Sequence, residues 1–133
     1  MISVALARKL RDAGLRWDPA PGDRFVVADR DMDNEVFTLA DVLAEVHEFP
    51  SGRVIGFNGT VEWALDSVEA RNSVWLPSEA QLRERLAGTF RRLTRTEEDW
   101  LVEIALPHGY VAFRADDPAE AYGHALLHLI TGE

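Results

Sequence analysis

The stretch at 53–68 constrains the fold of this chain more than any other part of the sequence. It contains Asn58-Gly59, a pair that tolerates the positive φ angles demanded by a two-residue hairpin turn. After this pair, apolar Val61, Trp63 and Leu65 alternate with polar residues, which is the period-two pattern of a strand with one buried face. We therefore predict a β-hairpin over 53–68, at the centre of a sheet that the helices cover.

Three helices are predicted by residues that cap helix ends. Each begins at a side chain whose oxygen can accept a hydrogen bond from the first turn, and each ends at a glycine. The start and stop residues are Ser3 and Gly14, Ser78 and Gly88, and Asp117 and Gly132. Gln81 completes a capping box with Ser78, and Pro118 and Glu120 give the last helix a box-like start. The apolar stripe predicted for this last helix consists of Tyr122, Leu126, Leu129 and Ile130.

Runs of alternating or β-branched residues predict further strands between these helices. The predicted strands cover 25–28, 35–40, 42–49, 89–95, 100–106 and 110–114. Residues 74–76 are also expected to be extended, because they lead into Pro77. Neighbouring strands should pair, so we predict an α+β fold whose antiparallel sheet is a meander of hairpins, in one sheet or in two sub-sheets.

Length and composition place this chain among small cytoplasmic proteins. Its 133 residues, 47% of them apolar, fit a single domain over 1–133. The absence of cysteine excludes disulfides and thiolate metal sites. No apolar run approaches the ~18 residues of a membrane helix, and charged residues near the N-terminus argue against a signal peptide. We expect no membrane partner.

The charge of the chain is acidic and unevenly distributed. A net charge of −9 argues against nucleic acid as a partner, because such binding relies on cations that neutralise phosphates. Residues 29–48 hold seven acids and one base, whereas residues 83–95 hold five arginines and one acid. These segments form either two solvated faces or a dipolar surface that orients a charged partner.

Two patterns resemble parts of metal sites. Asp29, Asp31 and Asp33 occupy alternate positions, as at the start of a calcium loop, but the sixth position is not glycine and the twelfth is not glutamate. His124 and His128 are four residues apart on the predicted last helix, yet two ligands make only half of a zinc site. Helical geometry predicts that both histidines face solvent. We therefore predict no metal and no cofactor, and these five residues are the weak candidates.

Catalytic residues are equally sparse in the sequence. Glu45 and His47 share one side of a predicted strand, and a carboxylate beside a histidine is the minimum for acid–base chemistry. The same arrangement is common on any solvated strand face. Asp66 could join them, although no motif ties it to a histidine. The chain lacks a nucleophile elbow, a phosphate-binding loop and a dinucleotide fingerprint.

Two tryptophans and two arginines are the candidates for contact with a partner. Trp17 and Trp75 lie beside prolines at element boundaries, where they are either lids on the core or anchors for a protein partner. Trp100 is in phase with the apolar residues of its strand and should lie in the core. Arg91 and Arg92 either contact an anion or guard a strand edge with charge.

Six segments spread along nearly the whole chain carry a family resemblance. They are DAGLRW at 12–17, PGDRF at 21–25, GFNGT at 56–60, EWALDSV at 62–68, VWLP at 74–77 and AYGHALL at 121–127. Together they resemble a family of short actinobacterial proteins that often carry the label pilus assembly protein CpaE. True CpaE proteins resemble MinD/ParA ATPases, which need a phosphate-binding loop that this chain lacks. The resemblance therefore implies no ATPase activity and transfers no catalytic residues.

The sequence favours a non-catalytic protein-interaction or adaptor module, because it holds many core and capping signals but no assembled catalytic set. Its protein partner and its oligomeric state are not indicated. One alternative is a small-molecule hydrolase or transferase that uses Glu45, His47 and Asp66. The other is an acidic regulator that competes with nucleic acid for a basic partner through the charge block at 29–48.

Overall fold

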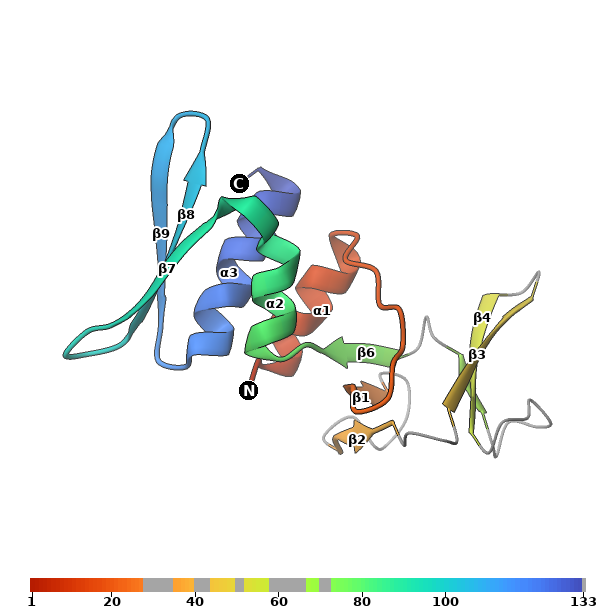
Figure 1. Ribbon diagram of the computed structural model, residues 1–133. Helices are drawn as coiled ribbons and strands as arrows, with labels where there is room; N and C mark the ends of the chain where they lie inside the picture. Colours follow the sequence, from red (N-terminus) through yellow and green to blue (C-terminus); the bar gives the residue numbers. More distant parts are fainter. Residues whose placement is uncertain (28–34, 40–43, 50–51, 58–66, 70–72, 133) are drawn as a thin grey trace. The chain divides into compact units, whose positions relative to one another are not determined.

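The computed structural model describes residues 1–27, 35–39, 44–49, 52–57, 67–69 and 73–132, and it divides into two compact units (Figure 1). Unit 1 comprises Met1–Leu15 and Pro77–Glu133, and unit 2 comprises Arg16–Leu76. The described residues form three α-helices and three antiparallel sheets of three strands each. This arrangement confirms the predicted α+β class, while the assignment of 1–133 to a single domain stays a prediction.

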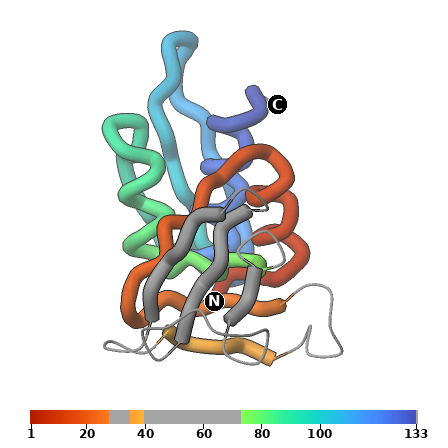
Figure 2. The backbone as a smooth tube through the Cα atoms, turned by 90° about the vertical axis from the view of Figure 1, so that its right-hand side faces the viewer, coloured from red at the N-terminus to blue at the C-terminus, as the bar shows by residue number. Residues whose placement is uncertain are grey.

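Helix α3 is the central element of unit 1. The unit consists of α1 (Val4–Asp12), α2 (Glu79–Leu86), a 3-10 turn (Ala87–Thr89), β7 (Phe90–Arg95), β8 (Trp100–Leu106), β9 (Gly109–Ala115) and α3 (Pro118–Thr131). Helix α3 packs against α1 and α2 and also against β8 and β9. The β8–β9 turn extends beyond the helices in both views (Figures 1 and 2). The strands follow the predicted positions closely, because their alternation is clear in the sequence.

Helix α3 is buried over more of its circumference than the predicted apolar stripe. Its buried residues are Ala119, Ala121, Tyr122, Gly123, Ala125 and Leu126. Helices and strands both pack on α3, so small residues on its other sides are buried as well as the large ones. The last turn differs from the prediction: Leu129 is half-buried, and Ile130 is among the exposed large apolar residues.

The predicted helix caps form the expected hydrogen bonds at α1 and α2. The Ser3 hydroxyl accepts from the Leu6 N–H at 3.1 Å. At the other end of α1, the Leu15 N–H donates to the Leu10 carbonyl at 2.9 Å, and Gly14 has a φ of 111°, as in a Schellman turn. The capping box of α2, between Ser78 and Gln81, is complete in both directions.

The end of α2 differs from the predicted glycine stop. The residue with positive φ is Ala87, at φ 52° and ψ −132°, whereas Gly88 lacks a positive φ. The chain turns one residue earlier than expected and continues into the 3-10 turn. A positive φ in a residue with a Cβ stores strain of about 1–3 kcal/mol.

The start of α3 is tied to the start of α1. Asp117 caps α3 as predicted, because its Oδ1 accepts from the Ala119 N–H at 2.7 Å, and its Oδ2 also pairs with the Met1 ammonium at 2.8 Å. Burial raises the pKa of Asp117, but the hydrogen bonds from the ammonium group and from the Ala119 N–H outweigh burial, so the pKa lies below its ordinary value. The Glu120 carboxylate accepts from the Ser3 N–H and from the Ser3 hydroxyl, so this predicted box residue caps the neighbouring helix.

Unit 2 contains two sheets whose pairing departs from a simple meander. The first has the order β2 (Phe37–Thr38), β1 (Arg24–Val27), β6 (Ser73–Leu76), and the second has the order β3 (Ala44–Phe49), β4 (Gly52–Phe57), β5 (Ser67–Glu69). The pairing of β1 with β6 was not predicted, because these strands are far apart in sequence. In place of the single central sheet or two sub-sheets that were predicted, the described strands form three sheets. Helix α3 packs on β8 and β9, which belong to the β7–β9 sheet of unit 1.

The pairing of β4 with β5 also differs from the predicted hairpin. Gly56 pairs with Ser67, whereas a two-residue turn at 58–59 would pair Gly56 with Val61. The tight-turn register is therefore wrong, since turn propensity acts locally while the register depends on the whole strand pair. The predicted turn at 58–59 and the alternating residues 61–65 lie outside the described residues.

Candidate functional site

Some of the predicted site residues lie outside the part of the chain that the structure describes. Those outside the described ranges are Asp29, Asp31, Asp33 and Asp66. Glu45 and His47 lie on β3, where their backbones pair with Gly56 and Val54 of β4. The hydrolase or transferase alternative stays a prediction, as does the acidic-regulator alternative, whose charge block at 29–48 is only partly described.

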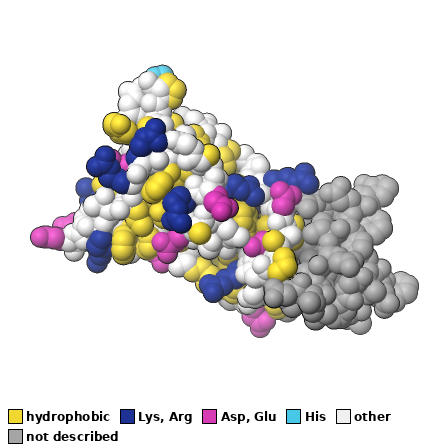
Figure 3. Space-filling model, in the orientation of Figure 1, with side chains coloured by type: hydrophobic (Ala, Val, Ile, Leu, Met, Phe, Trp, Pro, Cys, Tyr) yellow, Lys and Arg dark blue, Asp and Glu magenta, His cyan; other side chains and the backbone are white. Residues whose placement is uncertain are grey.

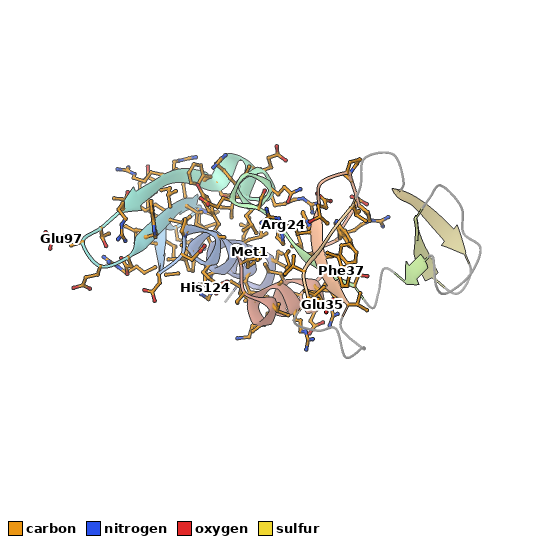
Figure 4. All side chains as sticks on the ribbon, turned by 90° about the horizontal axis from the view of Figure 1, so that it is seen from below. Met1, Arg24, Glu35, Phe37, Glu97 and His124 are labelled. Carbon is orange, nitrogen blue, oxygen red and sulfur yellow. The ribbon has the colours of Figure 1, made fainter. Side chains whose placement is uncertain are left out.

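The two histidines of α3 have different surroundings. His124 is exposed and is labelled in Figure 4. The ring of His128 lies 5.3 Å from the ring of Phe113 on β9 and is half-buried. The prediction that both face solvent is therefore wrong for His128, because α3 lies against β9. Within the described ranges, no group of three or more His, Asp or Glu side chains could hold a metal ion.

Trp17 belongs to the interior of unit 2. Its side chain is only 8% exposed, and its ring lies 5.4 Å from that of Phe25. Its Nε1–H donates to the carboxylate of Asp23 at 2.9 Å, and the same oxygen accepts from the Ala20 N–H at 3.0 Å. Asp23 is itself buried. This environment favours the core alternative that the sequence left open for Trp17.

Trp75 and Trp100 complete the described tryptophans. Trp75 is 8% exposed on β6, where it pairs with Phe25 of β1, so its burial also favours the core alternative. Trp100 is only half-buried at the start of β8, and the Arg95 guanidinium lies 5.2 Å from its ring centre. The predicted core position of Trp100 is therefore only partly correct.

One face of the β7–β9 sheet is uncovered by helices in unit 1. Val102 and Ile104 are fully buried and share the face on which α3 packs, together with Phe113. Residues opposite one another in antiparallel strands share a face, so the pairing identifies the residues of the other side. This open face consists of Arg92, Thr94, Leu101, Glu103, Ala105, Tyr110, Ala112 and Arg114.

Arginine side chains are positioned along the open face by ion pairs. Arg92 Nε lies 3.4 Å from a carboxylate oxygen of Glu103, and Arg114 Nη1 lies 3.2 Å from Asp99 Oδ1. Asp99 is fixed by the β7–β8 connection, because its Oδ1 accepts from the Thr96 hydroxyl at 2.6 Å. Both guanidinium groups remain largely exposed. Figure 3 shows Lys and Arg side chains among hydrophobic ones on one side of the described surface.

Arg91 and Arg92 are not brought together as an anion site. The register of β7 shifts between Phe90 and Arg92, so Arg91 occupies a bulge. The Nη1 of Arg91 donates to the Gly88 carbonyl at 2.6 Å and to the Phe90 carbonyl at 3.0 Å. Arg91 therefore lies at the β7 edge and Arg92 on the open face, while the two predicted alternatives, an anion contact and an edge guarded by charge, stay predictions.

Tyr110 is the residue that sequence reasoning missed. It is 69% exposed and lies on the open face next to Ala105, its cross-strand partner. The sequence pattern that could have identified Tyr110 is the alternation of β9, in which Val111 and Phe113 lie on the α3 side and Tyr110 lies on the other. Because tyrosine is enriched among the residues that dominate binding energy at interfaces, this exposed ring is a candidate contact for a partner.

Comparisons of the chain with protein families, with curated proteins and with solved structures gave no match. The resemblance to the short actinobacterial family therefore stays a prediction. None of the helices in the described part of the chain combines the length and the apolar character that a transmembrane span requires.

Proposed function

We propose that the protein is a non-catalytic interaction module that binds a protein partner through the open face of the β7–β9 sheet. The observation that carries the proposal is the 69% exposure of Tyr110, which lies opposite Ala105 on a face that no helix of unit 1 covers. Tyrosine and arginine are enriched among the residues that dominate binding energy at protein interfaces.

The chemistry of the open face indicates the kind of partner it fits. Leu101, Ala105 and Ala112 are its small or apolar residues, Glu103 lies between Leu101 and Ala105 on β8, and Arg92 and Arg114 are largely exposed. A complementary surface would present an apolar patch edged by carboxylates. Each of these arginines already pairs with a carboxylate of the same unit, so its attraction for a carboxylate of the partner should be modest and should weaken as salt screens it.

A photo-crosslinking experiment tests this proposal. A benzophenone amino acid would replace Tyr110 in one protein and Arg85 in a control, since Arg85 is exposed on α2 and away from the open face. The proposal requires a discrete crosslinked partner from cell extract for the Tyr110 position only. Equal crosslinking from both positions would refute the assignment of the open face.

Affinity measurements with the captured partner extend this test. Tyr110→Ala and Arg92→Glu should each weaken binding by about tenfold or more, the range expected for interface hot spots. Arg85→Glu makes the same charge change outside the face and should leave the affinity within about twofold. A loss of binding in Arg85→Glu that equals the loss in Arg92→Glu would show that net charge, and not the open face, determines binding.

A further inference from the structure

The two edges of the β7–β9 sheet are protected to different degrees. The β7 edge has a bulge at Arg91 and carries two further arginines, Arg92 and Arg95. Bulges and charges at an edge discourage pairing with another chain. The β9 edge is seven residues long, has a regular register throughout and contains Arg114 as its only charge. In the described part of the chain, no strand pairs with this edge.

The register identifies which backbone groups of β9 face outward. The Thr96 N–H donates to the Asp99 carbonyl at 2.9 Å, so the odd-numbered residues of β8 are the ones that bond to β7. The even-numbered residues of β8 consequently bond to β9, through the odd-numbered residues of that strand. The N–H and C=O groups of Tyr110, Ala112 and Arg114 therefore point away from β8, toward the open edge.

We propose that β9 pairs antiparallel with β9 of a second copy of this chain about a two-fold axis at Ala112. Ala112 is the central residue of the strand, so this register pairs the whole length of β9 with its symmetry mate. Each of the three outward-facing residues then exchanges two backbone hydrogen bonds with its counterpart. Tyr110 lies opposite Arg114 of the other copy, where an aromatic ring and a guanidinium attract each other.

The alternative registers satisfy fewer groups. A shift of the axis to Val111 or Phe113 keeps the hydrogen-bonding phase but leaves one outward-facing residue without a partner within the strand. With the axis at Ala112, Val111 also lies opposite Phe113 on the α3 side, an aromatic–aliphatic pair of the kind that stabilises antiparallel strands. Both side chains are only half-buried within one copy, so the pairing would cover apolar surface as well as backbone.

The proposed pairing goes beyond the proposed function and does not rest on it, because the backbone groups of the β9 edge carry it, while Tyr110 and Arg114 of the open face meet across the pair. A two-fold axis perpendicular to the sheet places both open faces on the same side and makes them continuous. A dimer held by one strand pair buries a small interface and should therefore be weak and concentration-dependent.

Cysteine crosslinking tests the pairing, because the natural chain contains no cysteine. Opposed residues of a hydrogen-bonded pair have Cα atoms about 5.5 Å apart, which suits a disulfide. Ala112→Cys should therefore form an intermolecular disulfide at least about tenfold faster than Thr94→Cys, an exposed position of the same face on β7. Equal rates for the two variants would overturn the proposal.

Two substitutions of Tyr110 test the register. Tyr110→Glu would face Arg114 of the other copy and should keep the dimer, whereas Tyr110→Arg would place like charges together and should weaken it by about tenfold. Sedimentation velocity between about 10 µM and 1 mM measures both against the natural chain. If the natural chain is monomeric over this whole concentration range, the pairing of two copies is overturned. The same result is expected if the β9 edge instead binds a peptide of another protein. Identical behaviour of the two variants would overturn the register.

Discussion

The packing of α1 on α3 depends on the absence of a side chain at Gly123. A Cβ added there would lie 2.6 Å from Leu6 Cδ2 and 3.1 Å from Ile2 Cδ1. Leu6 is 4% exposed and Ile2 is 3% exposed, so neither side chain can swing into solvent to make room. We predict that Gly123→Ala destabilises the fold, although alanine is the better helix former.

The magnitude follows from two opposing terms. Replacing glycine by alanine inside a helix favours folding by about 1 kcal/mol. Overpacking a dense core costs about 1–3 kcal/mol, and a contact as short as 2.6 Å to a buried side chain belongs at the upper part of that range. The net expectation is a destabilisation of about 1–2 kcal/mol, which corresponds to a decrease in Tm of roughly 3–6 °C for a chain of this size.

Urea unfolding followed by far-UV circular dichroism measures this change, and a double-mutant cycle identifies its cause. In the Leu6→Ala variant the clashing side chain is gone, so Gly123→Ala should stabilise the fold by up to about 1 kcal/mol. The effect of Gly123→Ala on the free energy of unfolding should therefore differ by about 2–3 kcal/mol between the natural chain and the Leu6→Ala variant. His124→Ala is the control, since the neighbouring helical position is exposed. Stabilisation by Gly123→Ala in the natural background would refute the reasoning.

Three further substitutions act on other local features. Ala87→Gly should stabilise by about 1 kcal/mol in urea unfolding, because glycine adopts the positive φ of this exposed residue without strain. The Asp117 carboxylate, with its lowered folded-state pKa, should stabilise the fold above the unfolded-state pKa of about 4, and this contribution should be lost as the pH falls through the folded-state value. Asp117→Asn keeps a cap but removes this pH dependence. Trp17→Phe should destabilise by about 1.5–3 kcal/mol, because the buried Asp23 carboxylate loses a donor.

Each of these expectations has an outcome that contradicts it. An Ala87→Gly variant whose free energy of unfolding is unchanged or lower would argue against backbone strain at residue 87. For Asp117→Asn, unfolding free energies measured between pH 2 and 7 that parallel those of the natural chain would contradict the linkage. A Trp17→Phe variant of unchanged stability would remove the structural role of the indole and return Trp17 to the candidate anchors.

Local chemistry is what the sequence predicted well. A cap depends on residues within one turn, so Ser3, Ser78 and Asp117 could each be recognised as helix starts from their immediate neighbours. The alternation of β8 is likewise local, and both Val102 and Ile104 are buried as that pattern indicates. Such features depend on residues close in sequence, which is why they can be recognised without a structure.

Non-local pairing is what the sequence could not supply. The pairing of Val26 with Val74 joins strands separated by a whole inserted sheet, and no short-range pattern encodes it. Glu120 illustrates the same limit, because its position in α3 predicted a box within that helix, while packing brought Ser3 of α1 close enough to bind it. Bringing residues distant in sequence together costs loop-closure entropy, which only the contacts of the complete fold offset. The sequence alone therefore does not show which distant residues will pair.

The candidate site was only partly accessible to sequence reasoning for the same physical reason. Arg92 was among the predicted partner-binding residues. Trp17 and Trp75 were predicted as partner-binding residues too, but both belong to unit 2 and are buried. A boundary position next to proline does not distinguish a lid from an anchor, because burial depends on what packs over it. Tyr110 could be identified only after the phase of β9 was known, since exposure is a property of the face and not of the residue type.

The register of β9 decides the core and the candidate surface together. Side chains alternate along a strand, so the phase that places Val111 and Phe113 on the α3 side necessarily presents Tyr110, Ala112 and Arg114 on the open face. A slip of one residue would bury a tyrosine and an arginine and expose the two apolar side chains. Selection for a stable core would therefore also hold the surface residues in place. Substitutions on the open face can then alter binding without altering the fold, which makes this surface separable from stability by experiment.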